Sequence, residues 1–203
     1  MKKCLLLGNG PSLANIPNEF LDKYDTFGSN RVYLKYTPDF YACVNPLVIK
    51  QYCTEIAQLK CLRFIPQRQA HLVPGSLHLR ITPQKIFATK EFSPLYEGYT
   101  VTYVLMQIAY WYGYEKVGLL GVDHSYKYDG KPNQQLRAEG KDPNHFDPNY
   151  FADGAVWNAP DLLKSEQAYV MAKDAYRDAG REIVNLGADS KLDIFPKEDI
   201  AEW

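Results

Sequence analysis

The feature that most constrains the fold of this chain is an apolar segment of strand length that ends in a turn of small residues. Residues 3–7 read KCLLL, and Gly8-Asn9-Gly10-Pro11-Ser12 follow directly. A buried parallel strand of an open α/β sheet ends in this way, and ligands of such sheets bind at the carboxyl ends of the strands. The glycines let a backbone approach a ligand closely, and the side chains of Asn9 and Ser12 can hydrogen-bond to a phosphate, a ribose or a base. The segment predicts a nucleotide site, with a simple tight corner as the structural alternative.

Apolar strand-like segments alternate with helical segments along the rest of the chain. The further expected strands are 25–29, 40–44, 61–66, 116–121 and 181–186. The expected helices are 12–21 with Ser12 as N-cap, 46–59, 99–112 and 160–179. This alternation predicts one doubly wound, mainly parallel, Rossmann-like α/β sheet. With 203 residues the chain is long enough for a single domain over 1–203, although residues 67–98 show only weak extended patterns.

Amide side chains follow three of the expected strands. Asn9 comes after the first strand, Asn30 after the second and Asn45 after the third, where Pro46 then suits the first turn of a helix. Since parallel strands present their carboxyl ends at one edge of a sheet, the three asparagines are expected to line that edge. Such a row could bind a nucleotide.

A long polar segment separates the fifth strand from the last helix. Residues 126–158 are too many for a simple connection inside a domain, which predicts a lid over the carboxyl ends of the strands or a partly disordered segment. The segment carries Phe146, Tyr150, Phe151 and Trp157, which a purely flexible linker would not usually contain. We therefore expect it to fold onto something, and to be more mobile without ligand.

Composition limits the choice of partner. A formal net charge of −1 gives no electrostatic footprint for nucleic acid, so the expected partner is a small molecule. The four cysteines form no CxxC pair and the sequence has no signal peptide, which indicates the reducing cytoplasm. No apolar run is long enough to span a membrane, although peripheral attachment at the inner membrane face remains possible from the sequence. The sequence also allows a homo-oligomer.

Three residues are candidates for acid–base chemistry. Asp123 follows the fifth strand, where it could act as a base, bind a ribose hydroxyl or a metal, or simply cap the turn. His124 is adjacent, but neighbouring side chains on an extended chain point in opposite directions, so the two are not expected to form a dyad. His145 could be the general base with Asp142 or Asp147 orienting its ring, or could be a structural residue of the lid.

Four motifs occur in the same order as in a known family. GNGPSL (8–13), GSNRVY (28–33), YACVNPLVIKQY (41–52) and TVTYVLMQIAYWYGYEKVGLLGVD (100–123) resemble the small bacterial CMP-sialic-acid-dependent sialyltransferases. The opening string also resembles bacterial proteins usually compared with archaeal 6-hydroxymethylpterin diphosphokinase. The resemblance is clear over about the first sixty residues and over 98–125. It implies a nucleotide-dependent transferase more firmly than it implies a sugar.

The resemblance also suggests residues that contact the nucleotide. The asparagines at the strand ends bind the CMP moiety in the sialyltransferases, which points to Asn9, Asn30 and Asn45 here. A Thr-Ser-Gly segment of the family matches residues 100–102, which makes Thr100 a further expected contact.

The chain also departs from the family. The arginine that precedes the Thr-Ser-Gly segment is replaced here by Gly98 or Tyr99. The phosphate-binding tyrosine pair is only loosely matched by Tyr126 and Tyr128, and the catalytic histidine near the start of the late helix has no counterpart, the nearest histidine being His145. These departures put sialic acid itself in doubt and leave nucleotide binding as the expectation.

Three functions are compatible with these observations. The leading one is a glycosyltransferase that transfers a sugar from a nucleotide, with a CMP-sugar as one candidate, to a small-molecule or glycan acceptor in surface glycan or glycolipid synthesis. It would need no cofactor, a base at His145 or His124, and a donor to the departing phosphate at Tyr126, Tyr128 or Lys127. The alternative is a pyrophosphokinase on a pterin-like alcohol, with ATP, Mg²⁺ and Asp123 as metal ligand. The third is a non-catalytic nucleotide-binding module.

Overall fold

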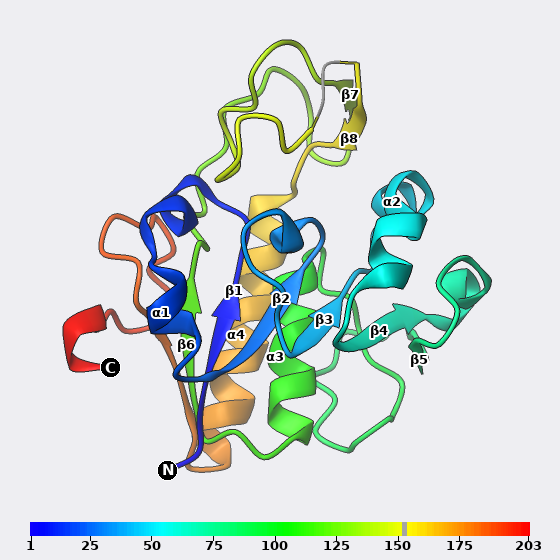
Figure 1. Cartoon of the computed structure of the whole chain (residues 1–203). Helices are drawn as coiled ribbons and strands as arrows, with labels where there is room; N and C mark the ends of the chain where they lie inside the picture. The colour runs from blue at the N-terminus through cyan, green and yellow to red at the C-terminus, as the bar shows by residue number, and fades with distance from the viewer. Residues whose placement is uncertain (152–153) are drawn as a thin grey trace.

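The predicted alternation of strands and helices produces a parallel sheet in a computed structural model that describes residues 1–151 and 154–203 (Figure 1). Among these residues seven strands pair in the order β5-β4-β3-β2-β1-β6-β9, and every neighbouring pair is parallel. The strands are β1 (Lys3–Leu7), β2 (Asp25–Ser29), β3 (Phe40–Ala42), β4 (Leu62–Pro66), β5 (Leu77–Leu79), β6 (Lys116–Leu120) and β9 (Glu182–Asn185). The predicted α/β fold class is confirmed.

The order of the strands creates a switch point beside β1. After β1 the chain adds β2 to β5 on one side, and it then crosses the sheet to place β6 on the other side of β1. The loops that follow β1 and β6 therefore leave in different directions from neighbouring strands. A crevice opens at such a point in doubly wound sheets, and ligands bind there.

Both faces of the sheet are covered by helices. Helices α3 (Val101–Trp111) and α4 (Leu162–Asp178) pack on one face, where Cys4 and Leu6 of β1 point. The other face, with Leu5 and Leu7, is covered by α1 (Asn18–Leu21) and α2 (Pro46–Gln58). This double burial explains why β1 is apolar throughout instead of alternating.

The ends of the elements follow local rules, with one correction. Asn45 caps α2 with Pro46 in its first turn, and Gly113, with φ 78°, follows the C-cap of α3 as expected. The expected helix over 12–21 is instead a 3₁₀ turn, η1 (Pro11–Asn15), and the short α1, because Pro17 interrupts it. Ser12 is not an N-cap, since the cap of η1 is Gly10.

Other elements complete the fold. Residues 67–98, where only weak patterns are visible in the sequence, contain η3 (Gln67–Leu72) and the edge strand β5. The remaining 3₁₀ turns are η2 (Val32–Leu34) and η4 (Ile200–Glu202). Within the described part of the chain, no helix combines the length and the apolarity needed to cross a membrane.

The predicted lid lies beyond the carboxyl ends of β1 and β6, at the top of Figure 1. It contains a short antiparallel pair, β7 (Gln135–Arg137) and β8 (Val156–Asn158). The backbone N–H of Phe146 donates to the carbonyl of Asn9 over 3.0 Å, which ties the lid to the turn after β1. Residues 152 and 153 of the predicted lid lie outside the described residues.

Candidate functional site

A cavity of about 410 Å³ lies between the strand ends and the lid. Its walls come from the loops after β1, β2, β3 and β6, from the starts of α3 and α4, and from the lid. Ten residues proposed from the sequence line it: Gly8, Asn9, Gly10, Asn30, Asn45, Thr100, Asp123, His124, Tyr126 and His145. Such a volume suits a small-molecule ligand.

The two glycines after β1 allow a close approach to the end of β6. A Cβ atom on Gly8 would overlap the carbonyl of Gly121, and one on Gly10 would overlap the carboxylate of Asp123. The N–H groups of Gly8 and Gly10 donate to Leu120 and Gly121, each over 2.8 Å. Within the chain itself, then, these glycines are needed for the packing of two loops against each other.

Asp123 holds this turn together. Its carboxylate accepts from the backbone N–H of Ser12 over 2.8 Å and from the Ser12 hydroxyl. This contact holds the turn after β1, whereas the cap considered from the sequence concerned the turn of Asp123 itself, and Asp123 also lines the cavity. Ser12, a further residue proposed from the sequence, points to Asp123 and is not part of the described lining.

Asn9 lines the cavity and has an acceptor atom without a described partner. Its Nδ2 donates to the carbonyl and to the hydroxyl of Ser29, both at 3.2 Å. Because a backbone carbonyl can only accept, this contact fixes which end of the amide is nitrogen. The opposite atom, Oδ1, is buried and has no partner among the described residues. Asn9 therefore holds, in the wall of the cavity, a buried acceptor whose position is fixed by Ser29.

Asn30 and Asn45 present the opposite chemistry. The Asn30 Oδ1 accepts from the thiol of Cys43 over 3.4 Å, and the Asn45 Oδ1 caps α2 by accepting from Leu47 N over 2.9 Å. Their carbonyl oxygens are thus engaged, whereas no hydrogen bond of either NH₂ group is seen within the described residues. The row of asparagines expected at the sheet edge is present, with one free acceptor and two amide donors.

His145 is oriented by a carboxylate and an aromatic ring. Its Nδ1 lies 2.8 Å from Asp142 Oδ2, and its ring stacks on Tyr150 with centroids 3.9 Å apart. Burial alone would raise the pKa of Asp142, but the hydrogen bond and charge of His145 and the N–H of Asn144 hold that pKa below its ordinary value.

This hydrogen bond orients the ring of His145. Because a carboxylate oxygen accepts, the Nδ1 atom of His145 donates to Asp142 Oδ2, and Nε2 is the ring nitrogen left without a described partner. Asp147, the other carboxylate considered from the sequence, accepts from Asn149 N over 2.7 Å instead. Asp142 is therefore the residue that orients His145.

Arg31 connects the lid to the rest of the site, and sequence reasoning missed it. Its guanidinium lies 4.1 Å from the ring centroid of Tyr52 and donates to the carbonyl of Tyr150, while its backbone N–H donates to the Tyr150 hydroxyl over 3.1 Å. Tyr150 is the ring under His145, so Arg31 fixes the support of the candidate base. Its position directly after Asn30 was the only available signal.

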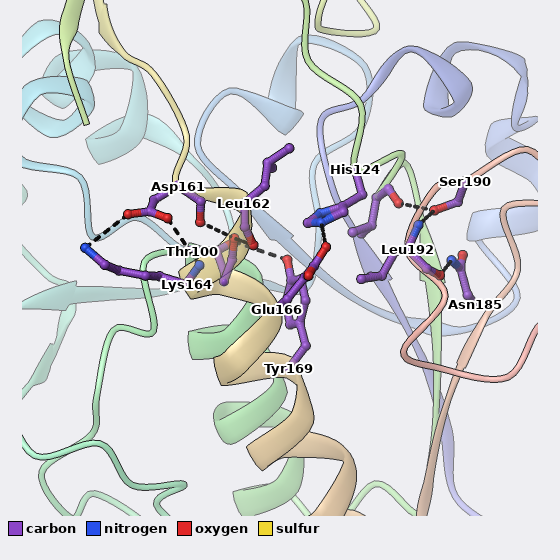
Figure 2. A network of polar contacts seen from close by, with 12 residues as sticks. Thr100, His124, Asp161, Leu162, Lys164, Glu166, Tyr169, Asn185, Ser190 and Leu192 are labelled. Carbon is purple, nitrogen blue, oxygen red and sulfur yellow. Dashed lines mark hydrogen bonds and ion pairs between the residues drawn. The ribbon is translucent and has the colours of Figure 1, made fainter. Parts of the chain in front are cut away.

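His124 forms a second histidine–carboxylate pair across the cavity. Its Nε2 lies 2.8 Å from Glu166 Oε1 on α4, as Figure 2 shows, and its ring meets the edge of Tyr169. The hydroxyl of Tyr169 lies 3.4 Å from Thr100 Oγ1, and that oxygen also caps α3. As expected, Asp123 and His124 do not form a dyad.

The start of α4 is a polar cluster that was not predicted. Asp161 caps the helix at Lys164 N, and its carboxylate also accepts from Lys164 Nζ (Figure 2). The same carboxylate accepts from Asn133 over 3.1 Å. Burial opposes ionisation, yet these donors keep the pKa of Asp161 below its usual value. The helix begins at Leu162 instead of the expected Pro160, because Asp161 is its cap.

Of the three proposed phosphate donors, Tyr126 alone is among the described lining residues. The hydroxyl of Tyr128 donates to the carbonyl of Pro160 over 3.2 Å. Lys127 is exposed, and its backbone groups bond to the side chain of Asn144. In the described chain, no group of three or more histidine, cysteine or acidic side chains comes together in a way that could hold a metal ion.

The far wall of the cavity contains an ion pair that the sequence did not reveal. Arg68 Nη2 lies 2.5 Å from Glu97 Oε1 and 3.3 Å from the carbonyl of Val44, just before Asn45. Tyr99 follows, with a left-handed backbone at φ 61°. Arg68, Glu97 and Tyr99 line the cavity together with Val44.

Comparison with known proteins relates this geometry to solved structures. No model of a protein family matches the chain, and no curated protein sequence matches it. The sialyltransferase CstII from Campylobacter jejuni, in complex with the substrate analogue CMP-3FNeuAc, superimposes with a TM-score of 0.53 and 18% identity over 97% of this chain and 86% of that one. A CstII variant in complex with CMP superimposes with a TM-score of 0.54 and 17% identity over 97% of this chain and 86% of that one. The chain therefore has the α/β fold of a bacterial sialyltransferase.

Proposed function

We propose that this protein is a glycosyltransferase that takes a sugar from a nucleotide donor, with CMP as the nucleotide. It transfers the sugar to a glycan or glycolipid acceptor in the synthesis of surface glycans. The proposal is supported by the shared fold, since the solved neighbours bind CMP or a CMP-sugar analogue. It is also supported by a cavity at the switch point of the sheet, where this fold places ligands.

The observation that carries the proposal is the unpartnered Oδ1 of Asn9. Leaving a buried acceptor without a donor costs about 1–3 kcal/mol, so a ligand that fits this cavity should bring an N–H or O–H group to it. The exocyclic amine of cytosine or a ribose hydroxyl can donate, whereas an ionised phosphate oxygen cannot. Asn9 is therefore assigned to the nucleoside, and the amide donors of Asn30 and Asn45 are suited to acceptor atoms of the nucleotide.

His145 is the favoured base in this mechanism. Its Nε2 takes the proton of the acceptor hydroxyl while that oxygen forms a bond to the anomeric carbon of the sugar. The bond from this carbon to the phosphate oxygen breaks, and its electron pair leaves with the nucleotide. Asp142 stabilises the imidazolium through Nδ1, and Tyr126 is placed to donate to the leaving phosphate.

Nucleotide titration of the wild type and of Asn9→Ala tests the proposal. We expect CMP to bind more tightly than UMP, GMP or AMP, with or without Mg²⁺, and the alanine variant to lose about 1–3 kcal/mol of binding free energy. Asn18→Ala, at an exposed position of α1, is the matched control and should bind as the wild type does.

Other outcomes would redirect the assignment. Binding of ATP that requires Mg²⁺ would favour the pyrophosphokinase. CMP binding without release of CMP from any CMP-sugar would favour a nucleotide-binding module. Unchanged affinity in Asn9→Ala would remove the role given to Asn9.

A further inference from the structure

A second cavity, of about 720 Å³, lies beside the first. It is formed by the end of β5, the segment after it and the loop before α3. Much of its wall is aliphatic or aromatic, from Leu79, Ile81, Pro83 and Tyr96. The volume is within the range of cavities that hold organic ligands, and walls of this kind with a few polar groups are typical of them.

The two cavities share a wall. Arg68, Glu97 and Tyr99 line both of them. The Arg68–Glu97 ion pair forms most of the polar part of this wall, and Arg68 is held at its base by the carbonyl of Val44. The second cavity therefore adjoins the candidate donor site at Arg68, Glu97 and Tyr99.

Tyr99 is displayed at this junction rather than packed in the core. Its side chain is 46% exposed, its backbone is in the left-handed region, and Lys164 Nζ lies 4.6 Å from its ring centroid. Exposed aromatic rings provide flat apolar faces. A pyranose ring has one face of C–H groups that can lie against such a ring, while its hydroxyls remain free for polar contacts.

We infer that the second cavity binds the apolar part of the acceptor, so that the acceptor substrate is an amphipathic glycoside with a hydrocarbon aglycone. Its sugar would lie at Tyr99 and present a hydroxyl to the first cavity, and its hydrocarbon would lie against Leu79, Ile81 and Pro83. The inference rests on the proposed function, because it identifies the second substrate of that reaction.

The division of chemistry between the cavities supports this assignment. The first cavity is lined by the asparagine row, by the histidines of the two histidine–carboxylate pairs and by the polar start of α4. The second has Arg68 and Glu97 as its charged side chains, and they neutralise each other. A neutral hydrocarbon can be buried there without leaving a charge unpaired, whereas a nucleotide phosphate would find no free cation in the described lining.

Binding of alkyl glycosides tests the inference. The probes are octyl glucoside, octyl galactoside and octyl N-acetylglucosaminide, each compared with its free sugar, below the micelle concentration and with CMP at saturation. We expect at least one octyl glycoside to bind about tenfold or more tightly than its free sugar. Ile81→Glu and Pro83→Glu should abolish this preference while CMP binds as in the wild type. Pro83 is exposed, so its variant guards against a folding defect.

Ile86→Glu is the matched control, since Ile86 is 39% exposed and lies outside the described lining of both cavities. Equal affinity for octyl glycosides and free sugars, a preference that survives both variants, or an equal loss in the control would each overturn the inference. Failure of the proposed function is seen separately, as absence of CMP binding in the wild type. In that case the same comparison without nucleotide still decides whether the cavity takes an alkyl chain.

Discussion

At the scale of single residues, the site combines fixed side chains with groups left free for a ligand. Asn9 is held by Ser29 and keeps its Oδ1 unpartnered among the described residues. His145 is held by Asp142 and Tyr150, with Nε2 left without a described partner. Such preorganisation lowers the cost of ordering side chains when substrate binds.

Replacing the candidate bases in turn should identify the one that acts. His145→Asn is expected to lower turnover by roughly 10²–10⁴-fold with little change in nucleotide affinity, because general-base catalysis contributes about that much. Loss of the true base should also remove the limb of the pH–rate profile near neutrality. His124→Asn and Asp123→Asn are measured in parallel, and His71→Asn, at an exposed position, is the control. Full activity of His145→Asn would return this histidine to a structural role.

The lowered pKa of Asp142 makes a prediction about stability. A carboxyl group whose folded-state pKa lies below its unfolded value near 3.8 stabilises the fold above that value, and the contribution is lost as pH falls through the folded pKa. Asp142→Asn should therefore unfold more easily than the wild type at pH 7, and the difference should shrink below about pH 4. Urea unfolding of both proteins at pH 7 and at a pH below about 4 measures this difference in the free energy of unfolding. A difference that is constant with pH would mean that the charge of Asp142 does not contribute.

At the scale of elements, the lid is the segment whose behaviour is least determined by the sheet. It is joined to the body by the Phe146–Asn9 hydrogen bond, by Arg31 and by the bond from Gln51 Nε2 to the carbonyl of Val156 over 3.0 Å. Tyr128 and Asn133 add hydrogen bonds to the start of α4. These are few and local contacts compared with the packing of a core strand, so local opening should require little free energy.

Hydrogen exchange with and without CMP should detect this opening. We expect slower exchange of amides in residues 142–151 when CMP is bound, and little change in α4, which serves as the internal reference. Arg31→Gln should speed exchange in the same residues in the free protein. Equal protection of 142–151 in both states would make the lid a static insertion.

Prediction from the sequence succeeded where local chemistry decides the structure. The first strand, Pro46 in the first turn of α2 and the asparagine row follow from apolar runs, the position preference of proline and the geometry of parallel strands. The pairs that orient the site, such as Arg31 with Tyr150 and His124 with Glu166, join residues more than 40 positions apart. Their partners depend on how the sheet is wound and have no local signal. Ser12 is one residue for which the prediction was wrong: it was expected to cap a helix, and instead its N–H donates to the distant Asp123.

At the scale of the whole molecule, one sheet separates packing from chemistry. Its two faces are filled by apolar side chains from four helices, and the functional groups gather at the carboxyl edge. The switch between β1 and β6 places Gly8–Gly10 against Gly121 and Asp123, so the site is built on two neighbouring interior strands. The edge strand β5 instead borders the second cavity through Leu79.

Asn9 also links two events that are usually considered apart. Its carbonyl accepts from Phe146 of the lid, and its side chain, at the wall of the cavity, holds the unpartnered Oδ1. Under the proposed function, a donor group that bonds to Oδ1 restrains the same residue that anchors the lid. Nucleotide binding and lid docking are then expected to strengthen each other to the same extent. We therefore expect the Phe146 contact to slow the departure of the nucleotide.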